Sequence, residues 1–162
     1  MTVDRFKKMF IYNYWANKRV WQHVIALSEE QFTRPCDYSM GSVREQVIHQ
    51  LFAEELWLTR VRDDGQAMEK RRFISRVSIA SHWKTVEQAW ISYLDSLTDD
   101  DLDTEISFKS LTYEKTFQNP RWEGLMQTLN HSTDHRAQTL SRIHQVGGDT
   151  SEQDFIFYTW GV

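Results

Sequence analysis

The sequence predicts an all-α protein, a four-helix bundle with a small β-hairpin or irregular insertion between the third and fourth helices. Only two prolines and six glycines interrupt the 162 residues, which favours long helices over short strands joined by tight turns. Four segments repeat apolar residues at spacings of three and four, the period of an amphipathic helix. Hydrophobic residues make up 40% of the chain, enough for a single domain over residues 1–162 with its own core.

The first helix is predicted from Val3 to about Leu27. Its apolar stripe is interrupted near the middle by Asn13 and Asn17. Two amides on a core face need hydrogen-bond partners, because burying them unpaired is costly. Two interpretations stay open here: the asparagines bond between helices, or they face a polar pocket.

The second helix is predicted to begin at Ser42, because Ser42 and Glu45 have the spacing of a capping box, and to end near Arg62. Residues 63–72 are charged and contain a glycine, so we expect a solvated connection there. The third helix is predicted over Ile79–Leu97. Three consecutive aspartates at 99–101 are expected to end it.

Between residues 102 and 117 the apolar period shifts toward two, which indicates a small, irregular β-hairpin. The fourth helix is predicted from just after Pro120 to about Val146, where Gly147 and Gly148 supply a C-terminal stop. The tail that follows contains Asp-Phe-Ile-Phe-Tyr at 154–158. This segment is too apolar to stay in solvent, so we expect it to pack back on the bundle.

The charge and the single cysteine exclude several classes of function. The net charge is −4, and the basic residues do not gather on one helix face, so we expect no nucleic-acid partner. No run approaches the roughly 18 apolar residues of a membrane span, and the N-terminal segment lacks the apolar core of a signal peptide. Cys36 cannot form an internal disulfide, which fits a reducing compartment. We therefore expect a cytoplasmic protein in which Cys36 is a structural or surface thiol.

Two of the six histidines, His131 and His135, have a spacing that suits metal binding. They are four residues apart on the predicted fourth helix, so that their rings project from one face, one turn apart. Ser132 stands where a zinc-protease helix has its glutamate, which excludes that mechanism. The line through the two histidines is small or polar throughout and lies beside the leucine stripe, as expected at the rim of a pocket. It consists of Gly124, Thr128, His131, His135 and Gln138.

His49 is the best candidate for a third ligand. It lies among apolar residues of the second helix, where an imidazole without a metal would need another partner. A core histidine hydrogen-bonded to a neighbour is the alternative that the spacing leaves open. The other three histidines, His23, His82 and His144, lie near helix ends or polar neighbours and are predicted to be structural or exposed.

The chain resembles the DinB/YfiT-like superfamily of metal-binding four-helix bundles nearly from end to end. Residues Tyr14–Asn17 resemble its aromatic-Trp-Ala-Asn signature, and Ser42–His49 resembles its second-helix pattern, in which a capping serine precedes the first metal histidine. Glu54, Glu55 and Trp57 continue that pattern. Leu129–Gln138 resembles the His-x-x-x-His-Arg-x-Gln helix, with alanine at 137 where many members carry glycine. The glycine pair and the apolar tail also fall in the expected order.

The resemblance implies that His49, His131 and His135 form a metal triad for one divalent transition metal ion. Zinc and nickel come first among the metals that imidazole suits. Members of the superfamily include thiol-S-transferases that use bacillithiol, mycothiol-dependent isomerases and many proteins without an assigned role. A fold does not fix a function, so the resemblance leaves the activity open.

Three hypotheses for function follow. In the first, the chain is a metal-dependent thiol-S-transferase that acts with a low-molecular-weight thiol, and its pocket is formed by Asn13, Tyr14, Asn17 and Arg136. Arg136 would pair with a thiol carboxylate or, alternatively, form a salt bridge to Glu45 or Glu54. In the second, a metal-dependent hydrolase, no general base is evident, because Asp134 lies off the face of the triad. In the third, the metal stabilises a non-catalytic binding or stress-associated module. For each we expect a homodimer.

Overall fold

The computed structural model describes residues 1–63 and 72–161, which are mostly helical as predicted. The predicted solvated connection lies almost wholly in 64–71, outside the described residues. The elements in chain order are α1 (Val3–Ala26), α2 (Glu29–Thr33), α3 (Val43–Arg62), α4 (Arg76–Asp95), a 3₁₀ helix η1 (Asp99–Asp103), β1 (Glu105–Lys109), β2 (Thr116–Pro120), α5 (Arg121–Gln145) and α6 (Phe155–Trp160).

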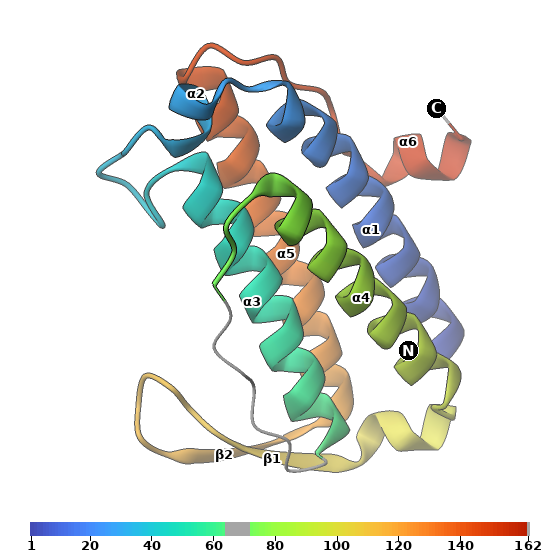
Figure 1. Cartoon of the computed structure of the whole chain (residues 1–162). Coiled ribbons are helices and arrows are strands. Elements are labelled where there is room, and N and C mark those ends of the chain that lie inside the picture. The colour runs from blue at the N-terminus through green and yellow to red at the C-terminus, as the bar shows by residue number, and fades with distance from the viewer. Residues whose placement is uncertain (64–71, 162) are drawn as a thin grey trace.

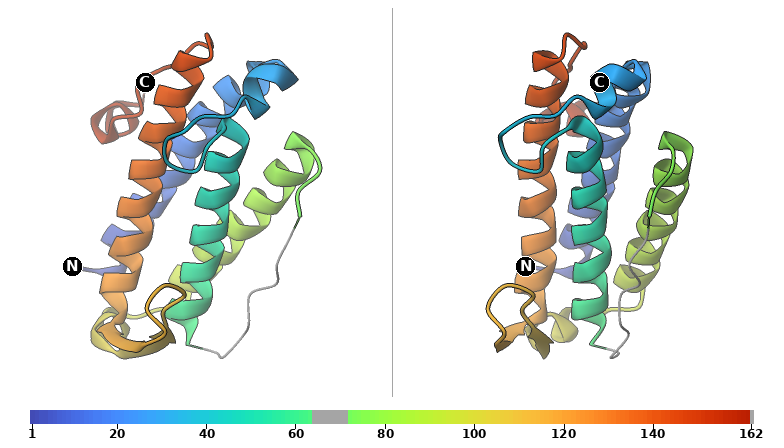
Figure 2. Two further views of the ribbon diagram at one scale, coloured as in Figure 1. Left: turned by 90° about the vertical axis from the view of Figure 1, so that its left-hand side faces the viewer. Right: turned by 60° about the vertical axis from the view of Figure 1, so that its left-hand side comes forward.

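Four long helices form the bundle, and each corresponds to a predicted one (Figure 1). α3 and α4 run in the same direction, and α1 and α5 run in the opposite one. In cross-section α1 contacts α4 and α5, and α3 contacts the same two helices. The α3–α5 pair and the α1–α4 pair therefore form two opposite sides of the bundle, and Figure 2 shows α4 standing apart from α5.

Capping boxes in the sequence account for the starts of α3 and α4. Ser42 and Glu45 form the predicted capping box, in which the hydroxyl of Ser42 accepts from the amide of Glu45 and the carboxylate accepts from the amide of Ser42. α4 starts at Arg76, three residues before the predicted start, because Ser75 and Ser78 form a second capping box. Reciprocal pairing of this kind satisfies amides that have no partner within the helix.

The end of α4 and the hairpin differ in detail from the prediction. α4 ends at Asp95 rather than Leu97, and the three aspartates belong to η1 instead of terminating the helix directly. The side chain of Asp99 accepts a hydrogen bond of 2.8 Å from the amide of Val3, which ties η1 to the start of α1. The predicted hairpin is present, with β1 antiparallel to β2 and Phe108 opposite Phe117.

Gly124 lets α3 and α5 approach closely beside the hairpin. A Cβ atom at this position would lie 2.6 Å from Cγ1 of Val61 and 3.3 Å from Cδ1 of Ile106. Any side chain would therefore push the helices apart. The core around this contact is formed by buried apolar side chains from all four long helices, including Phe10, Leu51, Trp90 and Leu125.

The C-terminal tail packs on α1 as predicted, but it also forms a short helix that the sequence did not indicate. The Tyr12 hydroxyl donates to the carbonyl of Gln153 at 2.8 Å, and the rings of Tyr12 and Phe155 meet edge to face with centroids 5.1 Å apart. α6 projects from the side of the bundle in Figure 1, and Trp160 at its end is exposed. No helix among the described residues is long and apolar enough to cross a membrane.

Candidate metal centre

Three histidines from two helices converge between α3 and α5. His49 lies on α3, and His131 and His135 lie one turn apart on α5. One ring nitrogen of each can be chosen so that all three lie within 4.8 Å of one another. The ring centroids are 4.3 Å apart for His131 and His135, and 4.5 Å and 5.3 Å from His49 to His135 and His131. The structure therefore brings together the three histidines that the sequence singled out.

The environment keeps the three imidazoles neutral. Burial lowers the pKa of His135 to about 4, and the charges of His131 and His49 act in the same direction. Burial also lowers the pKa of His131, and burial followed by the charge of His131 lowers the pKa of His49. A neutral imidazole has a free lone pair and is the form that binds a metal.

A chain of hydrogen bonds orients the ring of His135. The carboxylate of Asp134 only accepts, and it receives the side-chain N–H of Gln138 at 3.0 Å. The oxygen of Gln138 then accepts from Nε2 of Gln46 at 3.2 Å. The other polar atom of the Gln46 amide, Oε1, lies 3.0 Å from Nδ1 of His135 and can only accept a hydrogen bond from it. Nδ1 must therefore carry the proton, which leaves Nε2 of His135 as the atom that offers a lone pair.

The three side chains suit a divalent transition metal ion with open coordination positions. Among residues 1–63 and 72–161, no cysteine or carboxylate joins the three histidines in the cluster. His135 is only 6% exposed, whereas His49 and His131 are partly exposed and the cluster opens to solvent on their side. A structural zinc site is usually closed by four protein ligands, whereas a catalytic one keeps a position free.

A buried polar network lies behind the histidines and includes both predicted asparagines. Glu54 is 1% exposed, and its Oε1 accepts from Asn13 and Asn17, each at 3.3 Å. The same atom accepts from the Ser132 hydroxyl at 2.7 Å and from Gln50 at 3.1 Å. The interpretation that the asparagines hydrogen-bond between helices is therefore confirmed. Asn17 also lines a cavity on the other side of α1.

Arg136 belongs to this network and is also 1% exposed. Its guanidinium donates to the side-chain oxygens of Asn13 and Asn17, and to Gln153 in the tail at 2.6 Å. Arg136 forms no salt bridge with Glu45 or Glu54 among the described contacts, so that alternative is wrong: the two asparagines stand between Arg136 and Glu54. The fourth predicted pocket residue, Tyr14, faces α4 rather than the histidines.

A family model describes the chain almost completely. The model of the DinB family matches residues 1–161. The chain belongs to the DinB family. A search among curated protein sequences returned no match for this DinB-family chain.

Two crystal structures of DinB-like proteins share the fold of this DinB-family chain. One, from Bacillus cereus ATCC 10987, is 20% identical with a TM-score of 0.71, and the match covers 93% of this chain and 97% of that one. The other, YjoA from Bacillus subtilis, is 16% identical with a TM-score of 0.63 over 91% of this chain and 96% of that one. At these identities the likeness establishes the fold alone.

Sequence reasoning missed Gln46, although a signal for it was present. Gln46 lies three residues before His49 on the same helix, so that it faces α5 beside the metal ligands. Of the remaining histidines, His82 pairs with Glu55 at 2.9 Å and His23 bonds to Ser151 at 2.8 Å. His144 is exposed, so all three lie outside the cluster as predicted. Cys36 is partly exposed and accepts from the amide of Tyr38.

Proposed function

We propose that this DinB-family chain binds one divalent transition metal ion, zinc or nickel in the first place, through His49, His131 and His135. The observation that carries the proposal is the convergence of three imidazoles from two helices, with ligand nitrogens within 4.8 Å of one another. Like-charged imidazolium groups would repel at such distances, so the cluster is favourable only when its members are neutral or bound to a cation.

We further propose that the metal centre supports thiol transfer with a low-molecular-weight thiol. A divalent ion held there would supply Lewis acidity and lower the pKa of a nearby thiol at neutral pH. The open side of the cluster, formed by the partly exposed His49 and His131, supports access of a small-molecule substrate. In the transfer the thiol loses its proton to solvent, its sulfur forms a bond to an electrophilic carbon, and the leaving group departs with the bonding electron pair.

The residues around the cluster would hold the histidine rings in place and would not react with the substrate themselves. Gln46 holds the His135 ring through Nδ1, and the Ser132 hydroxyl, next to His131, is held by buried Glu54. Arg136 has its donors engaged by Asn13, Asn17, Thr133 and Gln153, so we assign it a structural role. Hydrolysis by bound water is the weaker hypothesis, because the nearby carboxylate of Asp134 is exposed and accepts from Gln138.

Metal content is the first test. Tag-free protein purified without chelators is analysed by elemental mass spectrometry, beside His49→Ala, His135→Ala and the control His144→Ala. We expect about one equivalent of metal in the wild type and in the control, since His144 is an exposed histidine of the same helix, and none in the other two. Absence of metal from the wild type after reconstitution with zinc and with nickel would contradict the proposal.

Thiol transfer is tested on the metal-loaded protein. Bacillithiol, mycothiol, glutathione and cysteine are each offered with monochlorobimane, which releases chloride as the carbon–sulfur bond forms and becomes fluorescent. We expect turnover with at least one thiol that chelation abolishes and metal restores. Metal binding without turnover for any thiol would instead favour a non-catalytic module, in which chelation lowers the melting temperature and no activity is lost.

We also propose that the chain forms a homodimer. Ile156 and Trp160 of α6 are exposed apolar side chains beside the bundle, and bundles readily form symmetric dimers. Sedimentation equilibrium of the full chain gives the mass directly. A monomer at every concentration would contradict the dimer without affecting the metal proposal.

A further inference from the structure

A pocket on the α3–α5 side of the bundle lies beside the metal centre. Its volume is about 250 Å³. Tyr38 from the loop between α2 and α3, Gln46 from α3 and Arg142 from α5 each line part of it. The hydroxyl of Ser39 donates to the side-chain oxygen of Gln138, so the loop is held against α5 and closes one side of the pocket.

Gln46 belongs to both the pocket and the metal centre. Its Oε1 lies 3.0 Å from Nδ1 of His135, and its Nε2 donates to Gln138 at 3.2 Å. Gln46 and Gln138 also line the pocket. The amide of Gln46 therefore stands between the His135 ring and the pocket, and a molecule bound at the metal reaches the pocket by extending over Gln138.

Arg142 lies on the same face of α5 as two of the metal ligands. It follows His135 by seven residues and His131 by eleven, which are two and three helical turns, so the three side chains project to one side. With a rise of 1.5 Å per residue, the guanidinium is roughly 10 to 14 Å from an ion held between the two histidines.

The free donors of the pocket favour an anion. One guanidinium nitrogen of Arg142 donates to Gln145 at 2.5 Å. Its other two nitrogens have no acceptor within the described part of the chain, and neither does the hydroxyl of Ser141 or of Tyr38. A planar guanidinium with two free N–H groups is suited to a carboxylate.

The wall of the pocket contains no competing carboxylate among the described residues. Asp134 lies outside the lining, and its carboxylate accepts from Gln138 at 3.0 Å. Glu45 also lies outside it and accepts from the amide and the hydroxyl of Ser42 at 2.7 and 2.9 Å. Arg142 is thus the one charged side chain of the lining, and an anion in the pocket is attracted to it.

The separation from the metal sets the length of the ligand. A zinc–sulfur bond is about 2.3 Å long and the atoms of an ion pair lie within about 4 Å, so roughly 4 to 8 Å remain between sulfur and carboxylate. One extended residue spans up to about 3.6 Å. We propose that Arg142 and this pocket bind the carboxylate of a low-molecular-weight thiol, one or two residues' length beyond the unit that bears the sulfur. The inference rests on the proposed thiol transfer.

The test compares three thiols that differ in their carboxylate. The peptide N-acetyl-Cys-Gly-Gly carries it two residues beyond the cysteine, the C-terminal amide of this peptide lacks it, and N-acetylcysteine carries it on the cysteine itself. Each is titrated into the zinc-loaded full chain by isothermal titration calorimetry. We expect the peptide acid to bind roughly five- to tenfold more tightly than the other two, the effect of a partly screened ion pair with hydrogen bonds.

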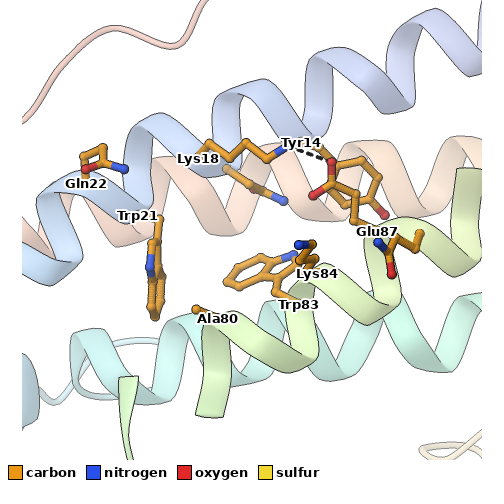
Figure 3. Close-up of a pocket in the computed structure, with 10 residues that line it drawn as sticks. Tyr14, Lys18, Trp21, Gln22, Ala80, Trp83, Lys84 and Glu87 are labelled. Atoms are coloured by element: carbon orange, nitrogen blue, oxygen red, sulfur yellow. Dashed lines mark hydrogen bonds and ion pairs between the residues drawn. The ribbon is translucent and has the colours of Figure 1, made fainter. Parts of the chain in front are cut away.

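The role of Arg142 is tested with Arg142→Gln, which should reduce the affinity for the peptide acid to that for the amide and leave the amide unchanged. Arg142→Lys should keep part of the difference, because it keeps the charge and loses the planar fork. Lys84→Gln is the control, since Lys84 lines the cavity between α1 and α4 on the opposite side of the bundle (Figure 3). Zinc content should stay at about one equivalent in all three variants. Equal weakening of acid and amide in Arg142→Gln, or of neither, would overturn the role of Arg142.

Binding and turnover together separate this inference from the proposed transfer. Selective binding of the acid that Arg142→Gln removes, without transfer to monochlorobimane, would support the pocket and contradict the transferase. Transfer with the same KM for acid and amide, unchanged in Arg142→Gln, would support the transferase and overturn the pocket. N-acetylcysteine weakened by Arg142→Gln as much as the peptide acid would overturn the predicted length. Absence of binding of all three thiols to the zinc-loaded chain would overturn both.

Discussion

Oε1 of Gln46 lies 3.0 Å from Nδ1 of His135 and fixes which nitrogen of that ring can bind a metal. The amide of Gln46 is itself oriented by Gln138. A residue such as Gln46, which hydrogen-bonds to a metal ligand without binding the metal, holds the ligand ring in place before the ion arrives. Less ordering of the ring is then required when the ion binds.

Replacing Gln46 should therefore weaken metal binding without removing a ligand. We expect Gln46→Ala to lower zinc affinity roughly 10- to 100-fold, and Gln46→Glu to restore most of it, because a carboxylate also accepts from Nδ1. Competition with a chromophoric chelator measures the affinities. Gln88→Ala, at an exposed residue of α4, is the control, and an affinity unchanged in Gln46→Ala would refute the orienting role.

The carboxylate of Glu54 should be among the most important polar groups for stability. Glu54→Ala would leave the buried donors of Asn13, Asn17 and Ser132 without their acceptor, and we expect a loss of about 3 kcal/mol or more in the free energy of unfolding. Glu54→Gln keeps one acceptor oxygen and should lose less. Urea denaturation followed by tryptophan fluorescence measures both variants.

The control for Glu54→Ala is the removal of an exposed carboxylate on another helix. Glu30 pairs with Arg34 at 2.8 Å on the surface, so Glu30→Ala should change the free energy of unfolding by only about 0.5 kcal/mol or less. A loss in Glu54→Ala as small as that in Glu30→Ala would show that the buried network contributes little.

Acid should destabilise the metal-free protein through the histidine cluster. The pKa of His135 is lowered to about 4 in the folded state, whereas in an unfolded chain it is about 6.5. The unfolded state therefore binds more protons between these values, and stability is present above pH 6.5 and is lost as the pH falls toward 4. Thermal unfolding at a series of pH values measures how steeply the stability changes with pH.

The change of stability with pH should depend on the three histidines of the cluster and not on the exposed His144. His135→Gln removes the shifted group and should flatten the dependence between pH 6.5 and pH 4, whereas His144→Ala should leave it unchanged. Zinc, bound by the neutral rings, should raise the melting temperature at neutral pH and lose this effect in acid. A slope that is the same in His135→Gln and in the wild type would contradict this assignment.

Gly124 should tolerate no side chain. Gly124→Ala places a methyl group 2.6 Å from Cγ1 of Val61, and we expect it to lower the free energy of unfolding by about 1–3 kcal/mol. Combining it with Val61→Ala removes the clashing atom, so that the double variant should lose less than the sum of the two single variants. Strict additivity in denaturant unfolding would show that the contact with Val61 is not the cause of the loss in Gly124→Ala.

Much of the fold followed from local signals in the sequence. The period of apolar residues located all four long helices, the spacing of Ser42 and Glu45 located the start of α3, and Gly147 located the end of α5. These signals act within a few residues along the chain, so the sequence contains them directly. The short helices α2 and α6 were not predicted, because five or six residues are too few to show a helical period.

The sequence by itself determined which histidines could bind a metal, because the spacing of His131 and His135 places both rings on one face of a helix whatever the rest of the fold. Only the tertiary structure decided that His49 meets them, that Gln46 orients His135, and that Asn13 and Asn17 separate Glu54 from Arg136. It also turned Tyr14 toward a cavity on the opposite side of the bundle. These relationships join residues far apart in the chain, and they depend on how helices rotate and pack against one another, which no local pattern encodes.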